Sequence, residues 1–571
     1  MESTSKNVAT VEKAKAVYKI LVADEISPEG IDVLESALSV SYLPEITPAE
    51  LLETIDQFDA LLVRSRTKVT ADVIKRGKKL KAIGRAGVGV DNIDITTATE
   101  AGILVLNSPE GNTASAAEHT VALMFALARK VPAADASLKA GKWERNKFMG
   151  SELFNKTLGV IGLGKVGSRV AHTAQALGMK IIFFDPLISA ERAAQLNFQS
   201  VSLEEIWRRA DFITIHTPKT RETANLISAS VLSRVKEGVR IINTSRGGII
   251  DEEALARAVK EGRVAGAALD VFEPEPLAKD SPLLELADKV VLTPHLGAST
   301  VEAQFNVAID LAEQMRDYLT AGIARSPVNL PFMRPEVLKS LGKYVWLSEA
   351  MGAVAGELVD GNIKEVEIIS YGALAGKDTA PLAVAALRGI FLRRMETVTY
   401  VNAHLIAKNN GISVRESKSR GEDESASRRS GAEGETENNQ FKDELSVIIT
   451  TASGLTSITG TILAHDEPII TRINDHPINL SPAQYMLFTA HRDQPGMVAK
   501  VAGALGNHDV NISTMSVGRK GVREHAVMVM TLDDPVPQEL ITDLSKLDGI
   551  HMARFVSLVS SIPGQFNKAN G

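Results

Sequence analysis

The chain has 571 residues, a formal net charge of −7 and no cysteine. Its length predicts three or four domains, and the lack of cysteine excludes disulfides, thiolate metal sites and a cysteine nucleophile. The acidic balance, without an evident basic face, argues against nucleic-acid binding. No apolar run is long enough to cross a bilayer, so we expect a cytoplasmic protein with no membrane partner.

The first half of the chain alternates short apolar strands with helical patterns, which is typical of parallel sheets. Residues 1–16 lack the apolar core of a secretory signal and are expected to form a disordered tail. Strands are then expected at 19–23, 60–63, 82–84, 103–106, 158–161, 180–184, 212–216, 240–243, 265–269 and 290–292. We predict two doubly wound α/β domains with a crevice between them. Residues 17–109 and 297–330 form the substrate-binding domain, and residues 110–296 form the second.

A glycine-rich turn, GLGKVG, leads from the first strand of the second domain into a predicted helix, and the second strand follows that helix. Gly162 permits the turn, Gly164 lets a pyrophosphate approach the backbone, and Gly167 lets helix and strand pack closely. Asp185 follows about 20 residues on, where a carboxylate accepts hydrogen bonds from a ribose diol and repels a 2′-phosphate. This order predicts a Rossmann domain that binds NAD rather than NADP. The alternative is a structural turn in an ordinary βαβ unit.

Arg246, Glu275 and His295 each lie just beyond a predicted strand, where ligands bind in open α/β sheets. His295 is expected to take the proton of an alcohol, while Glu275 orients the imidazole and stabilises its protonated form. Arg246 is expected to hold a substrate carboxylate, and Asp270 to face the nicotinamide carboxamide. The alternatives are a core histidine, a surface EPEP turn and a helix-capping arginine. We expect no metal.

Two other histidines compete for the role of base. His119 lies in the alanine-rich start of a predicted helix, and His216 ends a strand with no arginine or acidic motif beside it. We interpret both as structural.

The sequence from about residue 19 to residue 328 resembles the D-2-hydroxyacid dehydrogenase family. The matching blocks are GRAGVGVDNID (84–94), NSPEGNTASAAEHT (107–120), INTSRGGIIDEEAL (242–255), ALDVFEPEP (268–276) and TPHLGAST (293–300). The resemblance implies that Arg246, Glu275 and His295 form the catalytic set. It also implies NAD contacts from Lys165, Val166, Asp185, Thr217, Thr244, Asp270 and Gly297.

Within this family the sequence is most similar to the branch that oxidises 3-phosphoglycerate, a substrate that is anionic at both ends. The resemblance places Arg64 near the phosphate and the amides of Val88 and Gly89 near the carboxylate, and it makes Ser65 a further substrate-binding candidate. The alternative for Arg64 is a solvated surface charge.

The branch also presents a loop of one subunit to the crevice of its neighbour, and the matching stretch here is 141–150. Arg145 and Lys147 are then further candidates for the phosphate, and Trp143 for the subunit interface. The alternatives are a solvated charge for Lys147 and a half-buried core position for Trp143.

Residues 331–482 are expected to form a third, α+β unit. It resembles the intervening domain of the longer members of this branch, which implies an anionic regulator. Residues 417–440 have no large apolar side chain, so we expect a disordered surface insert there.

Residues 483–560 follow the order strand, helix, two strands, helix, strand, a ferredoxin-like pattern, and 561–571 are a tail. The unit resembles the ACT domain, a small-molecule regulatory module that pairs across a dimer interface. The resemblance implies a serine effector held by His491, Asp493 and Asn511, although many relatives carry asparagine where this chain has Asp493. The alternative is an ACT fold used only for assembly.

Together these resemblances imply NAD-dependent oxidation of 3-phosphoglycerate to 3-phosphohydroxypyruvate, the first committed step of serine biosynthesis, with regulation through the ACT-like unit. Two alternatives stay open: a glyoxylate or hydroxypyruvate reductase, and an NAD-sensing protein like the corepressors built on this fold. The ACT-like unit favours the first interpretation. A shared active site and a paired ACT-like unit predict a homo-oligomer, either a dimer or a tetramer.

Overall fold

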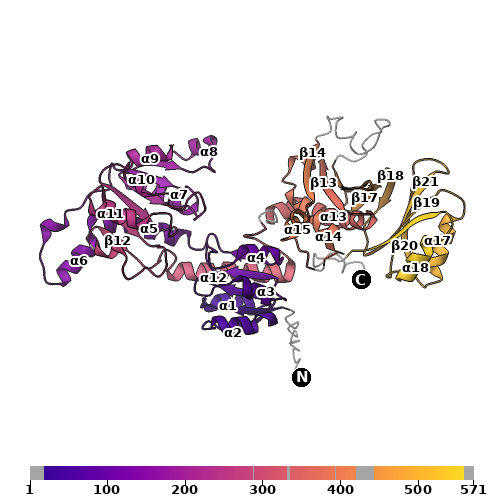
Figure 1. The fold of residues 1–571 in the computed structure, drawn as a ribbon, viewed down its shortest axis with the longest axis horizontal. Helices are drawn as coiled ribbons and strands as arrows, with labels where there is room; N and C mark the ends of the chain where they lie inside the picture. The colour runs from indigo at the N-terminus through magenta and orange to yellow at the C-terminus, as the bar shows by residue number, and fades with distance from the viewer. Residues whose placement is uncertain are drawn as a thin grey trace, which may run out of the picture.

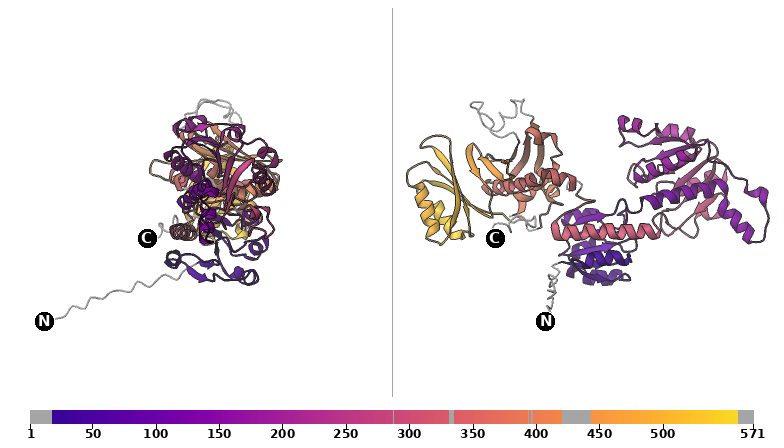
Figure 2. Two further views of the ribbon diagram at one scale, coloured as in Figure 1. Left: turned by 90° about the vertical axis from the view of Figure 1, so that its left-hand side faces the viewer. Right: turned by 180° about the vertical axis from the view of Figure 1, so that it is seen from behind.

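The computed structural model describes residues 18–286, 288–330, 335–392, 394–395, 397–419 and 443–558. The expected tails, 1–16 and 561–571, and the part of the expected insert from residue 420 on lie outside these residues. Four sheets form four units arranged in a row (Figures 1 and 2). No helix in the described parts of the chain has the length and apolarity needed to cross a membrane.

The first sheet is parallel and has the strand order β2-β1-β3-β4-β5. The order reverses between β1 and β3, and such a switch point is where open α/β sheets bind ligands. Long helix α12 (Val301–Ala321) leads from the second unit back onto this one and packs against α1. The elements are β1 (Lys19–Val22), α1 (Pro28–Glu35), β2 (Ser39–Tyr42), α2 (Pro48–Thr54), β3 (Ala60–Val63), α3 (Ala71–Arg76), β4 (Ala82–Arg85), α4 (Ile95–Glu100) and β5 (Leu104–Asn107).

The second sheet has seven parallel strands in the order β12-β11-β10-β9-β6-β7-β8. Its strands are β6 (Thr157–Ile161), β7 (Lys180–Phe184), β8 (Gln199–Ser200), β9 (Phe212–Ile215), β10 (Val239–Asn243), β11 (Val264–Leu269) and β12 (Val290–Leu292). Its helices are α5 (Thr113–Arg129), α6 (Val131–Lys139), α7 (Lys165–Ala176), α8 (Ala190–Gln195), α9 (Leu203–Arg209), α10 (Ala229–Leu232) and α11 (Glu252–Lys260).

The central strands of both sheets are buried on both faces. All four residues of β3 (ALLV) and of β9 (FITI) are buried, because helices cover the two sides of each parallel sheet. The apolar cores on the two faces of the second sheet are separate clusters that hold Ile213 and Phe212, neighbours on one strand. This rigid framework fixes the loops at the strand ends.

The third unit is a mixed six-stranded sheet in the order β14-β13-β15-β16-β17-β18, in which only β13 and β14 pair in parallel. Its elements are α13 (Pro335–Leu358), β13 (Ile363–Tyr371), α14 (Ala380–Leu392), α15 (Ala403–Asn409), β14 (Ser413–Ser419), β15 (Glu444–Thr451), β16 (Leu455–Ile462), β17 (Pro468–Ile473) and β18 (His476–Leu480). The expectation of a disordered insert from residue 417 was wrong at its start. Ser417–Ser419 belong to β14, where backbone pairing with β13 holds polar residues without apolar burial.

The fourth unit has the predicted ferredoxin-like order, with strands arranged β20-β21-β19-β22. Its elements are β19 (Tyr485–Arg492), α17 (Met497–Gly506), β20 (Ile512–Arg519), β21 (His525–Leu532), α18 (Gln538–Ser545) and β22 (Ile550–Ser557). Leu487 and Met530 pack in the same cluster as the helices. Phe488 and Val529, which alternate with them along the strands, join the core of the third unit instead. The predicted fold class is confirmed.

Candidate active site

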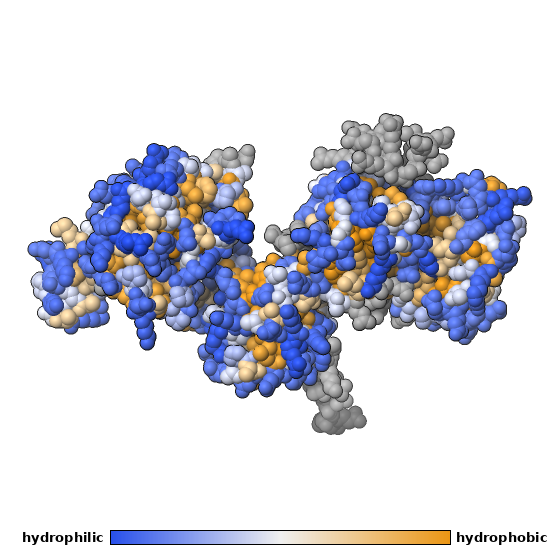
Figure 3. Space-filling model, viewed as in Figure 1, coloured by the Kyte–Doolittle hydropathy of each residue, from blue (hydrophilic) through white to orange (hydrophobic). Residues whose placement is uncertain are grey.

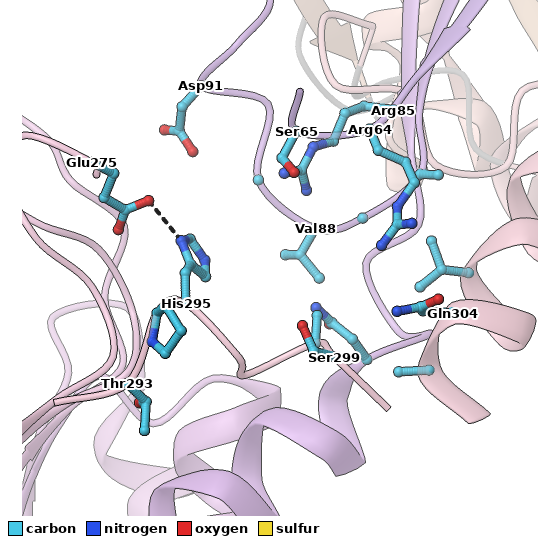
Figure 4. Close-up of a pocket in the computed structure, with 18 of the residues that line it drawn as sticks. Arg64, Ser65, Arg85, Val88, Asp91, Glu275, Thr293, His295, Ser299 and Gln304 are labelled. Carbon is cyan, nitrogen blue, oxygen red and sulfur yellow. Dashed lines mark hydrogen bonds and ion pairs between the residues drawn. The ribbon is translucent and has the colours of Figure 1, made fainter. Parts of the chain in front are cut away.

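A cavity of about 760 Å³ opens between the first two units, at the carboxyl ends of their strands (Figure 4). The substrate-binding domain lines it with residues after β3 and β4, and the second domain with residues after β10, β11 and β12. The polar residues among them include Arg64, Ser65, Arg85, Asp91, Arg246, Glu275, Thr293, His295, Ser299 and Gln304. The cavity therefore collects the catalytic residues and the first-domain substrate residues predicted from the sequence.

His295 and Glu275 form a hydrogen-bonded pair in this cavity. The imidazole Nδ1 lies 2.8 Å from Oε2 of Glu275, and both side chains are partly exposed to the cavity. The amide of Phe272 donates to the other oxygen, Oε1, at 3.1 Å. Because Nδ1 is held, Nε2 is the ring nitrogen left for a substrate proton.

Asp270 holds the turn that carries His295. Its fully buried carboxylate accepts the amides of Leu296 and Gly297, each at 2.8 Å, and the Thr293 hydroxyl at 2.6 Å. Burial opposes ionisation of Asp270, but hydrogen bonds from His119, Thr293 and Leu296 outweigh it and lower the pKa. His295 has a φ of +55°, a left-handed conformation that this turn stabilises.

The competing histidines are both held by neighbours. Nε2 of His119 lies 3.1 Å from Oδ1 of Asp270 and 3.2 Å from the Thr293 hydroxyl. Nε2 of His216 lies 2.9 Å from the Thr214 hydroxyl, and burial lowers the pKa of His216 to about 4. Neither residue lines the cavity, as the structural interpretation requires.

The glycine turn after β6 has the geometry that a dinucleotide needs. Gly162 has a φ of +87°, and a Cβ on Gly167 would lie 2.1 Å from the Gly162 carbonyl oxygen. Apart from the adjoining backbone, no described atom lies within 4 Å of where a Cβ on Gly164 would be, so the backbone there is open to a ligand. Asp185 accepts the amide of Leu163 at 2.8 Å, which places its carboxylate beside the turn.

Thr217, Thr244 and Lys165 are further predicted cofactor residues. The Thr217 hydroxyl is buried without a hydrogen-bond partner among the described residues, as expected of a group that a ligand would satisfy. Thr244 pairs its hydroxyl with that of Thr120 at 2.7 Å. Lys165, which begins α7 ahead of Val166, pairs with Glu110 on the surface. The residues present thus fit NAD.

Asp24 organises the loop that presents Arg64. This buried carboxylate, just beyond β1, accepts the Arg64 amide at 2.5 Å and the Thr67 hydroxyl at 2.6 Å. It also accepts Nε of Arg66 at 3.2 Å. This bond holds the Arg66 side chain at Asp24, whereas Arg64 is among the residues that line the cavity.

Sequence reasoning missed Arg85, although it ends β4 within the matching block GRAGVGVDNID. Its Nε is buried with no hydrogen-bond partner in the described chain, and burial, followed by the positive charge of Arg246, lowers its pKa to about 10. A buried guanidinium in a cavity calls for an anion. Its place at a strand end is the signal that could have identified it.

Arg145 and Lys147 do not line the cavity of their own chain. They lie in a short 3₁₀ helix (Arg145–Phe148) on an arm that projects with α6 at one end of the molecule (Figures 1 and 3). Trp143 on this arm is 83% exposed and Met149 is 79% exposed. The alternative of a half-buried core position for Trp143 was therefore wrong, and the neighbouring-subunit role stays a prediction.

One chain does not bring the three predicted effector residues together. His491 pairs with Ala526 near one end of β21, whereas Asn511 precedes Ile512, which pairs with Leu532 at the other end. The separation is roughly 20 Å at about 3.3 Å per residue. Antiparallel pairing puts the start of β20 at the far end of the sheet from His491, so a site that uses all three residues needs two copies of the chain, and the effector site stays a prediction.

The three residues also differ in their surroundings. His491 is 2% exposed, and its Nδ1 has no hydrogen-bond partner among the described residues. Asp493 accepts the Arg523 amide at 3.0 Å. Asn511 donates to Asp533 at 2.6 Å.

Comparison with known proteins agrees with this geometry. Residues 121–297 match the NAD binding domain of D-isomer specific 2-hydroxyacid dehydrogenases, residues 340–474 the D-3-phosphoglycerate dehydrogenase intervening domain, and residues 485–549 the ACT domain. A solved Thermus thermophilus structure aligns with 54% of this chain and 99% of its own, at 34% identity and a TM-score of 0.51. The cavity thus lies in a D-isomer specific 2-hydroxyacid dehydrogenase, whose cofactor is NAD.

Full-length relatives narrow the class. The D-3-phosphoglycerate dehydrogenase of Synechocystis is 48% identical over 95% of both chains. That of Archaeoglobus fulgidus is 41% identical over 95% of this chain and all of its own. The chain belongs to the D-3-phosphoglycerate dehydrogenase family, and the family, fold and cofactor predicted from the sequence are confirmed.

Proposed function

We propose that the family reaction, oxidation of the C2 hydroxyl of 3-phosphoglycerate to the ketone, is carried by His295, Glu275 and Arg246. The His295–Glu275 hydrogen bond of 2.8 Å, in a cavity lined by three arginines, is the observation that supports this assignment most directly. NAD, when bound, accepts the hydride from C2.

The histidine handles the proton that accompanies hydride loss. Nε2 of His295 takes the C2 hydroxyl proton as the carbonyl forms, and Glu275 stabilises the resulting imidazolium through Nδ1. Arg246 binds the substrate carboxylate and stabilises charge on the developing carbonyl oxygen. Asp270 keeps the imidazole in place through the buried turn that it holds.

Substrate selection rests on the charges of the substrate-binding domain. Arg64 and Arg85 come from the ends of neighbouring strands, β3 and β4, and together suit a phosphate. Val88 and Gly89 also line the cavity, and their amides suit the carboxylate end. A reductase for an unphosphorylated acid has no need of this cationic wall.

NADH absorbance tests the assignment, with 3-phosphoglycerate in one cuvette and D-glycerate in another. We expect activity on the phosphorylated acid and a loss of about 100-fold or more for His295→Ala. The matched control is His172→Ala, because His172 is an exposed histidine on α7. Full activity of the His295 variant, or equal activity on D-glycerate, would contradict the assignment.

The exposed arm supports a homo-oligomer with shared active sites. Helix α6 buries none of its residues within the chain, and exposed apolar surface of this kind marks an interface. In this arrangement Arg145 and Lys147 reach the phosphate in the partner's cleft. Molar mass by light scattering tests the assembly, and a monomer that retains full activity would exclude it.

The ACT domain suits an amino-acid effector, and serine is the candidate. His491 and Asp493 from one copy, with Asn511 from another, offer partners for the carboxylate and ammonium groups. Titration of serine into the assay should lower activity. Calorimetry without measurable heat, together with unchanged rates, would leave the domain a role in assembly alone.

A further inference from the structure

An ion pair joins the two domains at the cavity. Asp91 follows β4 in the substrate-binding domain, and Arg246 follows β10 in the NAD-binding domain. Nε of Arg246 donates to Oδ2 of Asp91 at 2.9 Å, while Nη1 donates to the Ser245 carbonyl oxygen at 2.7 Å. Asp91 therefore occupies part of the donor fork that a substrate carboxylate would use.

The pair lies where the substrate carboxylate is expected. A Cβ on Gly89 would lie 1.9 Å from Nη2 of Arg246 and 2.8 Å from Oδ2 of Asp91. The guanidinium and the Asp91 carboxylate thus both lie against the backbone whose amides suit the carboxylate. Only a glycine at position 89 leaves room for this approach.

The charges of the cavity explain why a carboxylate sits there. Three guanidiniums line the cavity, and Asp91 and Glu275 are its acidic lining residues. Glu275 is engaged by His295 and the Phe272 amide. Asp91 is left as the counter-ion of the arginines when no substrate is present. Among the charges that act on Arg85, that of Asp91 favours its protonated form.

We propose that Asp91 is an internal stand-in for the substrate carboxylate: it pairs with Arg246 in the free enzyme, and the substrate displaces it. This inference rests on the proposed role of Arg246. The Asp91 side chain is 70% exposed, so it can return to water at little cost once the substrate takes over the arginine. The substrate then replaces Asp91 as the ionic link between the two domains.

The sign of the effect on affinity tests this inference. Because Asp91 competes with the carboxylate, Asp91→Asn should lower the KM for 3-phosphoglycerate and the inhibition constant of D-glycerate by the same factor. Exposed ion pairs are worth about 0.2–1 kcal/mol, which corresponds to about 1.5- to 5-fold. The inhibition constant of inorganic phosphate, which carries no carboxylate, should change least.

Asp94→Asn is the matched control, since Asp94 lies three residues on and caps α4 without contacting an arginine. It should leave both constants as in the wild type. A higher KM in Asp91→Asn would mean that Asp91 only orients Arg246, and equal effects in the two variants would mean a general charge effect. Either result overturns the inference. If the wild type did not oxidise 3-phosphoglycerate at all, the proposed function itself would fail.

Discussion

Nδ1 of His295 lies 2.8 Å from Oε2 of Glu275, although the two residues come from loops after different strands, β12 and β11 (Figure 4). The pairing of these strands in the parallel sheet brings their carboxyl ends together. The hydrogen bond fixes the ring and leaves Nε2 for the substrate. We therefore regard Glu275 and His295 together as the proposed base, because the carboxylate decides which ring nitrogen is free.

Replacement of Glu275 by glutamine should lower kcat by about 10- to 100-fold, because the imidazolium loses its counter-charge while the ring keeps a hydrogen-bond partner. Steady-state rates of NADH formation measure the effect. Glu273→Gln is the matched control, since Glu273 pairs with Lys219 at 2.6 Å instead of the histidine. Equal losses in the two variants would show that the effect is not specific to the pair.

Asp24→Asn should raise the KM for 3-phosphoglycerate by at least about tenfold, because asparagine keeps only one of the two buried oxygens that hold the loop presenting Arg64 and puts a donor in place of the other. It should also destabilise the protein by about 1–3 kcal/mol, the usual cost of unsatisfied buried donors. Kinetics and thermal unfolding measure the two effects. Glu25→Gln, the exposed neighbour, serves as control, and an unchanged KM for Asp24→Asn would exclude the role.

The sequence predicted the apolar strands better than the short or polar ones. Strands β3 and β7, inside their sheets, and β12, at an edge, begin and end where the apolar runs do, because an apolar run is a direct signal of a strand that packs in a core. Strands β2, β8 and β14, at sheet edges, were not predicted. They are short or polar, and backbone pairing with an inner strand decides their conformation.

Residues of the candidate site could be predicted where the position of a residue just beyond a strand was enough to identify it. Arg246, Glu275 and His295 needed only the rule that ligands lie beyond the carboxyl ends of strands. Asp24 and Asp91 could not be predicted in the same way, because their roles depend on partners 40 and 155 residues away in the chain. For Asn511 the resemblance names the residue without saying which subunit supplies it, so its role stays a prediction.

His216 should make the NAD-binding domain sensitive to acid. Burial lowers its pKa from 6.5 to about 4 in the folded state, so below pH 6.5 only the unfolded chain gains the proton. The contribution of His216 to the free energy of unfolding is present above pH 6.5 and is lost as the pH falls toward about 4. Below that pH it changes no further. A shift of this size is worth about 3 kcal/mol.

His216→Asn should reduce the fall in the free energy of unfolding between pH 6.5 and about 4. Trp207, which is buried in the same domain, can report urea unfolding in a Trp143→Phe, Trp346→Phe background. His172→Asn, on the exposed face of α7, should leave the slope as in the wild type. Parallel slopes for the wild type and the His216 variant would show that other groups cause the acid sensitivity.

Mixing two defective variants should restore the response to serine. His491 and Asn511 lie at opposite ends of one ACT sheet, so a site that uses both needs two copies. His491→Ala and Asn511→Ala should each lose serine inhibition. In a random mixture about half of the symmetric pairs contain one copy of each variant. In such a pair one site carries both substitutions and the other carries neither.

Partial inhibition by serine should therefore reappear on co-refolding, and it should be absent when the two proteins are combined without subunit exchange. Asp533→Asn, which alters the partner that Asn511 contacts at 2.6 Å, tests whether that hydrogen bond competes with the effector. If it competes, this variant should respond at lower serine concentration. Failure of the exchanged mixture to respond, while the wild type does, would contradict an effector site that is shared between two copies.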